Sequence, residues 1–231
     1  MSAAAQFMEV ANATAALAQR NPAYISYRVH GTVHVKRGER DFERVVVYRT
    51  ADGRAVVKAG TGAGKAGAAE PLPPDFDALA KFDVKGFVHA DGVLDMHIVN
   101  LKALQYNVSS QADTVARSLK DYEVSVVDDA PPGQVHLHLH GTPAFFKINE
   151  RWIDDVWYDA ASHVPTRIVW GGANEFVLDT RYSVASGAWL VKSVDIRKTL
   201  HPWFVGSSPF SAHCDFDDYR TGADESAVAP A

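Results

Sequence analysis

The sequence predicts an α+β fold built on a single, strongly curved antiparallel sheet, a half-barrel of about eleven strands. Apolar and polar residues alternate in one short segment after another, most clearly over residues 152–220, which is typical of half-buried strands. These segments stop at Gly, Pro, Asn or Ser, the residues that favour tight turns. Because a one-sided sheet must cover its apolar face, we expect an N-terminal helix and short inserted helices over the concave side.

Length and composition are those of one globular domain. The chain has 231 residues, of which 47% are hydrophobic and 22% charged, and we expect one domain over residues 1–220 with a disordered tail over 221–231. A net charge of -5 and a pI near 6.0 argue against nucleic-acid binding. No segment reaches the roughly 18 consecutive apolar residues of a transmembrane helix.

The only cysteine, Cys214, excludes an internal disulfide framework and a metal cluster of several cysteines. No basic start followed by an apolar segment marks a signal peptide. Two compartments therefore stay open. The chain is cytoplasmic, or it is a mature periplasmic or otherwise extracytoplasmic protein whose export signal has been removed.

The N-terminal half begins with a helix and continues with strands. Residues 2–20 are rich in alanine and place Phe7, Val10 and Leu17 on one stripe at helical spacing, and Pro22 ends the helix. Strands are expected over residues 24–36, 41–50 and 54–59. In the first of them, alternation sets Ile25, Tyr27, Val29, Gly31 and Val33 against Ser26, Arg28, His30, Thr32 and His34.

The middle of the chain is less regular. Residues 60–75 are rich in glycine and alanine and then in proline, which predicts a mobile loop. The resemblance of Gly60–Ala66 to a phosphate loop fails, because Ala66 stands where a Ser or Thr must bind magnesium. Beyond the loop, the expected elements are helices over 74–82 and 109–120 and strands over 84–89, 93–101, 122–127 and 134–140.

The C-terminal meander resembles the outer-membrane lipoprotein carrier and receptor superfamily, which includes sensors of envelope stress. The strand that ends in Trp157-Tyr158-Asp159 turns through small residues and restarts at Pro165. A hairpin runs from Tyr182 through Gly187 to Trp189, and an aromatic and acidic cluster, Phe216 to Tyr219, closes the last strand. In this superfamily an arginine on an early strand helps to pass the cargo on. Arg28 and Arg44 both lie on early strands, and the sequence does not distinguish between them.

The resemblance implies non-enzymatic binding of a hydrophobic ligand, by a carrier or sensor outside the cytoplasm and without a cofactor. The ligand would be a lipid or acyl chain, free or on a lipoprotein, and a membrane-associated protein is a further partner that it allows. A regulatory protein–protein interaction module without stable cargo is the alternative. From alternation, the candidate ligand-binding residues are Leu94, Met96, Ile98, Leu137, Leu139, Ile168, Trp170, Phe176, Leu178 and Tyr182.

A second alternative is a metal-dependent enzyme that uses histidine-rich strands. His136, His138 and His140 alternate with Val135, Leu137 and Leu139 and so share one face. His136 and His140 are roughly 13 Å apart along a strand, so at most two neighbours can bind one ion. His30 or His34 would supply a third ligand if the strands paired. A solvated polar face is the simpler interpretation.

Two apolar stretches lie outside the alternating strands. The loop over 201–206 carries Trp203 and Phe204, and Phe145-Phe146 precedes the meander. Each stretch is interpreted either as a loop that folds back onto the sheet or as a flap over the cavity that contacts a membrane or partner.

Overall fold

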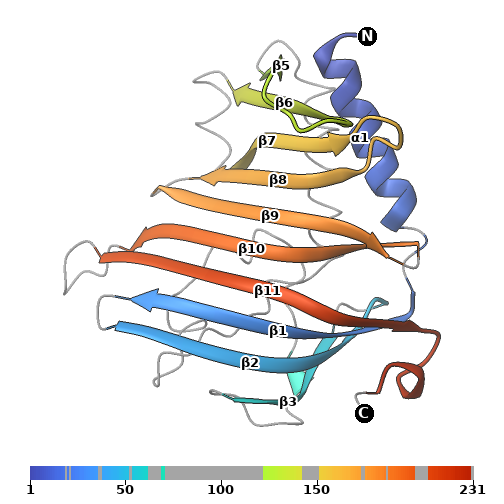
Figure 1. Cartoon of the computed structure of the whole chain (residues 1–231), viewed down its shortest axis with the longest axis vertical. Coiled ribbons are helices and arrows are strands. Elements are labelled where there is room, and N and C mark those ends of the chain that lie inside the picture. The colour runs from blue at the N-terminus through green and yellow to red at the C-terminus, as the bar shows by residue number, and fades with distance from the viewer. Residues whose placement is uncertain are drawn as a thin grey trace.

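One open antiparallel sheet dominates the computed structural model (Figure 1). The structure describes residues 1–18, 20, 22–35, 38–51, 54–61, 69–70, 122–141, 151–172, 175–185, 187–200 and 208–229. In this part of the chain the sheet has 11 strands in the order β4-β3-β2-β1-β11-β10-β9-β8-β7-β6-β5. The predicted fold class, a half-barrel of about eleven antiparallel strands with an N-terminal helix, is confirmed.

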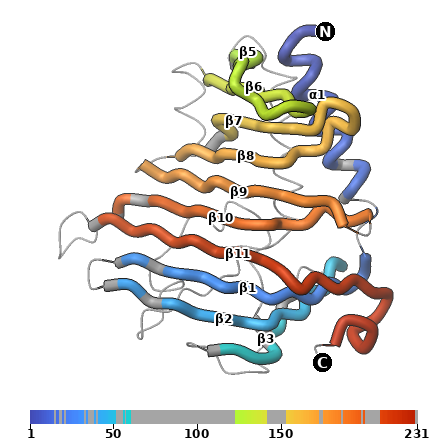
Figure 2. Tube along the Cα trace, viewed as in Figure 1, coloured from blue at the N-terminus to red at the C-terminus, as the bar shows by residue number. Residues whose placement is uncertain are grey.

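Each strand pairs with its neighbour in sequence, except where β11 returns to lie beside β1. The strands are β1 (Tyr24–Val35), β2 (Gly38–Arg49), β3 (Arg54–Thr61), β4 (Ala69–Glu70), β5 (Tyr122–Val127), β6 (Gln134–Gly141), β7 (Arg151–Asp159), β8 (Pro165–Gly172), β9 (Phe176–Ala185), β10 (Ala188–Leu200) and β11 (Ser208–Gly222). The β1–β11 pairing joins the first and last parts of the chain. The N-terminus nevertheless lies near β5 and the C-terminus beyond β1, at opposite ends of the sheet (Figure 2).

Helix α1 (Ala3–Ala18) lies across the ends of the strands at the β5 side of the sheet (Figure 1). It contacts β5 and β10 through a buried stripe of Phe7, Val10, Ala11 and Thr14. The spacing of three and four residues puts these side chains on one face of the helix. The Tyr158 hydroxyl donates to Gln6 Oε1 at 2.6 Å and ties the helix to β7. Proline at position 22 cannot continue the helix.

The turn between β7 and β8 has the form that the superfamily resemblance predicted. Asp159 Oδ1 accepts hydrogen bonds from the backbone N–H groups of Ala161 and Ser162 at 3.2 and 2.8 Å and from the Ser162 hydroxyl at 2.7 Å. Hydrogen bonds from Ser162 lower the pKa of Asp159. His163 takes a positive φ of 58°, and β8 then begins at Pro165. Asp side chains commonly stabilise turns in this way, by accepting hydrogen bonds from nearby backbone N–H groups.

The structure corrects two expectations about irregular segments. Ala69–Glu70 form the short strand β4 inside the stretch expected to be a loop, because they extend the edge of the sheet beside β3. In the expected disordered tail, β11 continues to Gly222 and a 3₁₀ helix, η2 (Ser226–Val228), follows. The burial of Val228 gives that segment an apolar anchor.

Several predicted elements lie outside the described residues. They are the helices over 74–82 and 109–120, the strands over 84–89 and 93–101, the loop over 201–206 and Phe145-Phe146. No helix in the described ranges has the length and apolar character to cross a membrane.

Candidate functional site: the inner face of the sheet

The sheet has two chemically different faces. The inner face, on which α1 packs, is defined on β9 by Phe176, Leu178, Thr180 and Tyr182, which are all buried. The outer face carries the intervening residues, including Asp179 and Arg181, and is largely polar. The register carries this division across the sheet, since Trp170 lies opposite Leu178, and Leu178 lies opposite Ile196. A continuous apolar surface therefore spans from β6 to β2.

The structure places the described candidate ligand-binding residues together. They lie on three strands, are at most 6% exposed, and belong to one hydrophobic cluster: Leu137, Leu139, Ile168, Trp170, Phe176, Leu178 and Tyr182. The other three candidates, Leu94, Met96 and Ile98, lie outside the described residues. The seven described candidates share one face of the sheet, as alternation predicted. Their role in binding a ligand stays a prediction.

The structure shows that Arg44 and Arg28, which the sequence did not distinguish, lie on opposite faces of the sheet. Arg44 on β2 lies opposite Val29 and alternates with Phe42 and Val46, so it faces inward and is 4% exposed. Its guanidinium lies 5.5 Å from the centre of the Phe42 ring, within the range of a cation–π contact. Arg28 faces outward and pairs with Glu43 at 3.0 Å. Of the two, Arg44 alone can meet a ligand on the inner face.

The aromatic and acidic cluster near the end of β11 also contributes to the inner face. Phe216 and Tyr219 both pack against Tyr27, with ring centres 5.9 and 5.7 Å apart. Residues three apart on a regular strand face opposite sides. A bulge on β11, which places one extra residue opposite β1, and the positive φ of 50° at Asp218 bring both rings to one side. The Tyr219 hydroxyl donates to the Val191 carbonyl at 2.5 Å.

On the outer face, histidines pair with carboxylates. Asp129 Oδ1 lies 2.6 Å from His136 Nδ1, and Asp155 Oδ1 lies 2.9 Å from both His136 Nε2 and His138 Nδ1. The Trp157 ring stacks on His136 with centres 3.9 Å apart, which explains why His136 is buried on the polar face. Arg167 lies over the same indole at 4.2 Å.

The pairing of the two histidine-rich strands that a shared metal site would require is not found. Five strands separate β1, which carries His30 and His34, from β6. At about 4.8 Å a strand the two sites are roughly 29 Å apart along the sheet. Among the residues that the structure describes, no three or more His, Cys, Asp or Glu side chains are arranged to hold a metal ion.

His213 lies between two carboxylates, and we predict that this contact makes the stability of the folded protein depend on pH. Its ring nitrogens lie 2.7 Å from Asp195 Oδ1 and 3.1 Å from Asp215 Oδ2. Burial lowers the pKa of His213, but the bonds to the two carboxylates outweigh it and raise the pKa. A raised folded-state pKa stabilises the protein below the unfolded value of about 6.5, and this contribution is lost as the pH rises through the folded value.

We therefore expect the free energy of unfolding to fall as the pH increases from about 6.5 upward, with a shallower fall in His213→Gln. Urea unfolding of both proteins across this range measures the difference. Identical slopes for the wild type and the variant would contradict the assignment to His213.

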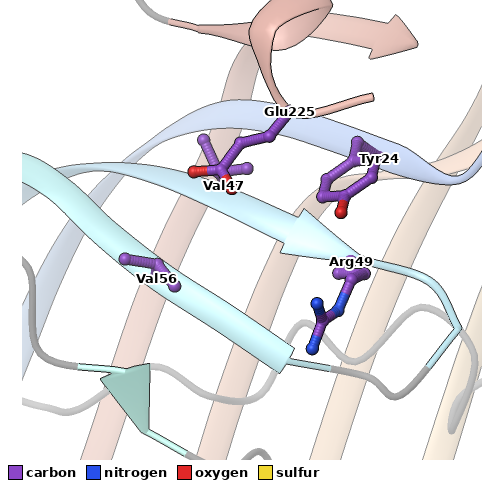
Figure 3. Close-up of a pocket in the computed structure, with 5 residues that line it drawn as sticks. All are labelled: Tyr24, Val47, Arg49, Val56 and Glu225. Carbon is purple, nitrogen blue, oxygen red and sulfur yellow. The ribbon is translucent and has the colours of Figure 1, made fainter. Parts of the chain in front are cut away.

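A small hollow lies on the outer face, below the C-terminal segment (Figure 3). Its volume is about 190 Å³, and it is lined by Tyr24, Val47, Arg49, Val56 and Glu225. Glu225 from the C-terminal segment also pairs with Lys58 at 2.6 Å. Sites for drug-sized ligands measure roughly 300–1,000 Å³. The hollow is too small for an acyl chain, and the inner face is the stronger candidate.

Comparisons with known proteins agree with the fold. No family model matches the sequence. No curated protein matches it either. The crystal structure of a DUF1329 family protein from Desulfovibrio piger is similar over 99% of this chain and 100% of that one, with a TM-score of 0.50 and 11% identity.

Two other crystal structures have lower scores. A LolA superfamily protein from Nitrosomonas europaea has a TM-score of 0.44 and 9% identity, covering 95% of this chain and 96% of that one. A putative outer membrane lipoprotein-sorting protein domain from Vibrio parahaemolyticus has a TM-score of 0.47 and 12% identity, covering 96% of each. The likeness to the DUF1329 protein shows the fold alone: the chain adopts an open antiparallel half-barrel, as the sequence predicted.

Proposed function

We propose that this protein binds a hydrophobic ligand on the inner face of the half-barrel, without catalysis, as a carrier or sensor outside the cytoplasm. The ligand is a lipid or acyl chain, free or attached to a lipoprotein. The observation that carries the proposal is the contrast between the two faces of one sheet. The inner face is apolar and aromatic across eight strands, while the outer face is dominated by paired charges and histidines.

Physical chemistry supports this assignment. The part of the chain that the structure describes has no second sheet to fill the concave side, and α1 contacts only part of that side, chiefly β5 and β10. Flexible apolar chains fit such a surface because their burial releases about 0.8 kcal/mol for each methylene group. Arg44 adds a buried positive charge on β2 that suits an anionic or ester group. The residues proposed to contact the chain include Leu178 and Trp170.

One observation favours a second function. The inner-face side chains are buried even without a ligand, with Leu137, Ile168 and Trp189 at 0% exposure. A filled core of this kind suits a regulatory module that binds another protein, such as a membrane-associated one, and holds no cargo.

Native mass spectrometry distinguishes the two functions. The protein is incubated with vesicles of phosphatidylethanolamine and phosphatidylglycerol and is then separated from them. We expect a mass increase that matches a phospholipid or fatty acid and acyl chains in the organic extract. An unchanged protein mass with an acyl-free extract would contradict ligand binding and favour the interaction module.

A further inference from the structure

Two hydroxyl groups on the inner face of β9 are buried without hydrogen-bond partners. Thr180 is 0% exposed and Tyr182 is 5% exposed. Neither Thr180 Oγ1 nor the Tyr182 hydroxyl has a hydrogen-bond partner in the part of the chain that the structure describes. Aliphatic residues flank them across the ladder: Ile168 and Val194 lie opposite Thr180, and Val191 lies opposite Tyr182.

Three other buried polar groups near the inner face are paired within the fold. The Tyr158 hydroxyl donates to Gln6 at 2.6 Å, the Trp189 indole N–H to the Pro165 carbonyl at 2.9 Å, and the Thr14 hydroxyl to the Val10 carbonyl at 2.8 Å. A buried hydroxyl that lacks its partner destabilises a protein, because it has given up its bonds to water. Two such groups side by side on one strand therefore point to a partner other than the residues that the structure describes.

The Tyr182 hydroxyl is suited to donate. Burial raises its pKa far above the usual value. The Thr180 hydroxyl lies close enough to lower the pKa in part, but the two groups do not meet in hydrogen-bond geometry. The group therefore keeps its proton at physiological pH. Arg44 is four strands away, roughly 19 Å along the sheet at about 4.8 Å a strand. It is too distant to serve the same polar group.

We propose that Thr180 and Tyr182 form the polar end of the ligand site and donate hydrogen bonds to the carboxyl or ester oxygens of a bound acyl chain. This inference rests on the proposed function and names its ligand class. Two donors at positions i and i+2 on one strand lie roughly 7 Å apart at Cα, and side-chain rotation brings both to one carboxyl group. The flanking Ile168 and Val194 contact the methylene groups. Both side chains are buried in this structure, so a ligand reaches their hydroxyl groups only when the inner face opens.

Competition between decanoic acid and decane tests the assignment. Each displaces an apolar naphthylamine dye from the wild-type protein, from Thr180→Val/Tyr182→Phe, and from Tyr158→Phe. The first variant keeps both side-chain shapes and removes both hydroxyls. The control variant removes a hydroxyl that is already paired within the fold. Thermal unfolding of each protein reports whether it is folded.

We expect the wild type and Tyr158→Phe to prefer decanoic acid by about tenfold, as one or two net hydrogen bonds allow. The double variant is expected to bind both compounds equally and to unfold at the wild-type temperature or above it, because it has lost two unpaired buried groups. A double variant that keeps the preference, or a wild type without one, would overturn the inference but leave ligand binding intact. A wild type that binds neither compound nor the dye would overturn both.

Discussion

Replacing Trp189 with alanine is expected to lower the free energy of unfolding by about 3–5 kcal/mol. The indole is 0% exposed, stacks on the Tyr182 ring with centres 4.0 Å apart, and donates to the Pro165 carbonyl at 2.9 Å. It therefore joins β8, β9 and β10 near one end of the inner face. Alanine leaves a cavity and an unpaired carbonyl at the start of β8, and urea unfolding followed by circular dichroism measures the loss.

The Trp189→Phe variant serves as the matched control. Phenylalanine keeps a ring beside Tyr182 but cannot donate to Pro165, so we expect a loss smaller than that of alanine. A loss below about 1 kcal/mol for Trp189→Ala would show that Trp189 is peripheral to the core, contrary to its burial.

Replacing Gly31 with alanine is expected to destabilise the protein by about 1–3 kcal/mol. An added Cβ would lie 2.2 and 2.3 Å from the Phe42 ring atoms Cζ and Cε1 and 3.0 Å from Cys214 Sγ. Phe42 is 4% exposed and Cys214 is 0% exposed, so the ring has little space into which it can move. The glycine is needed because the ring of the neighbouring strand lies directly over the backbone of β1.

A double-mutant cycle isolates this contact. In the Phe42→Ala background the ring is absent, and the further change Gly31→Ala is expected to cost almost nothing, which gives a coupling free energy close to the whole single-mutant effect. Equal losses in the two backgrounds would place the cause elsewhere, such as at Cys214.

The sequence predicted most of the architecture because alternation is a local signal. The inward and outward residues of β1 and β6 are as alternation assigns them, with Leu137 and Leu139 buried and His140 exposed. Ser26 keeps its predicted place on the outer face, opposite Val47, but it is 3% exposed. Its burial was not predictable locally, because Val47 lines the hollow below the C-terminal segment, which is distant in sequence.

The pairing of strands that are distant in sequence was harder to predict. Nothing local indicates that β1 pairs with β11, and this pairing keeps His30 away from the histidines of β6. The inward position of Arg44 does follow from its alternation with Phe42 and Val46, and that of Thr180 from its alternation with Leu178 and Tyr182. Their lack of solvent contact depends on the assembled fold. Ligand identity depends on the shape of the whole inner face, which no single segment encodes.

Tryptophan quenching by a brominated fatty acid tests ligand binding on the inner face most directly. Trp170 lies on the inner face, while Trp157 lies on the outer face between His136 and Arg167. Bromine quenches an indole only at close contact. Trp189 also lies on the inner face, stacked on Tyr182. We predict that dibromostearic acid quenches the wild type and Trp157→Phe strongly, and Trp170→Phe/Trp189→Phe much less. Quenching that disappears in Trp157→Phe but persists in Trp170→Phe/Trp189→Phe, or no quenching in any protein, would contradict an acyl chain on the inner face.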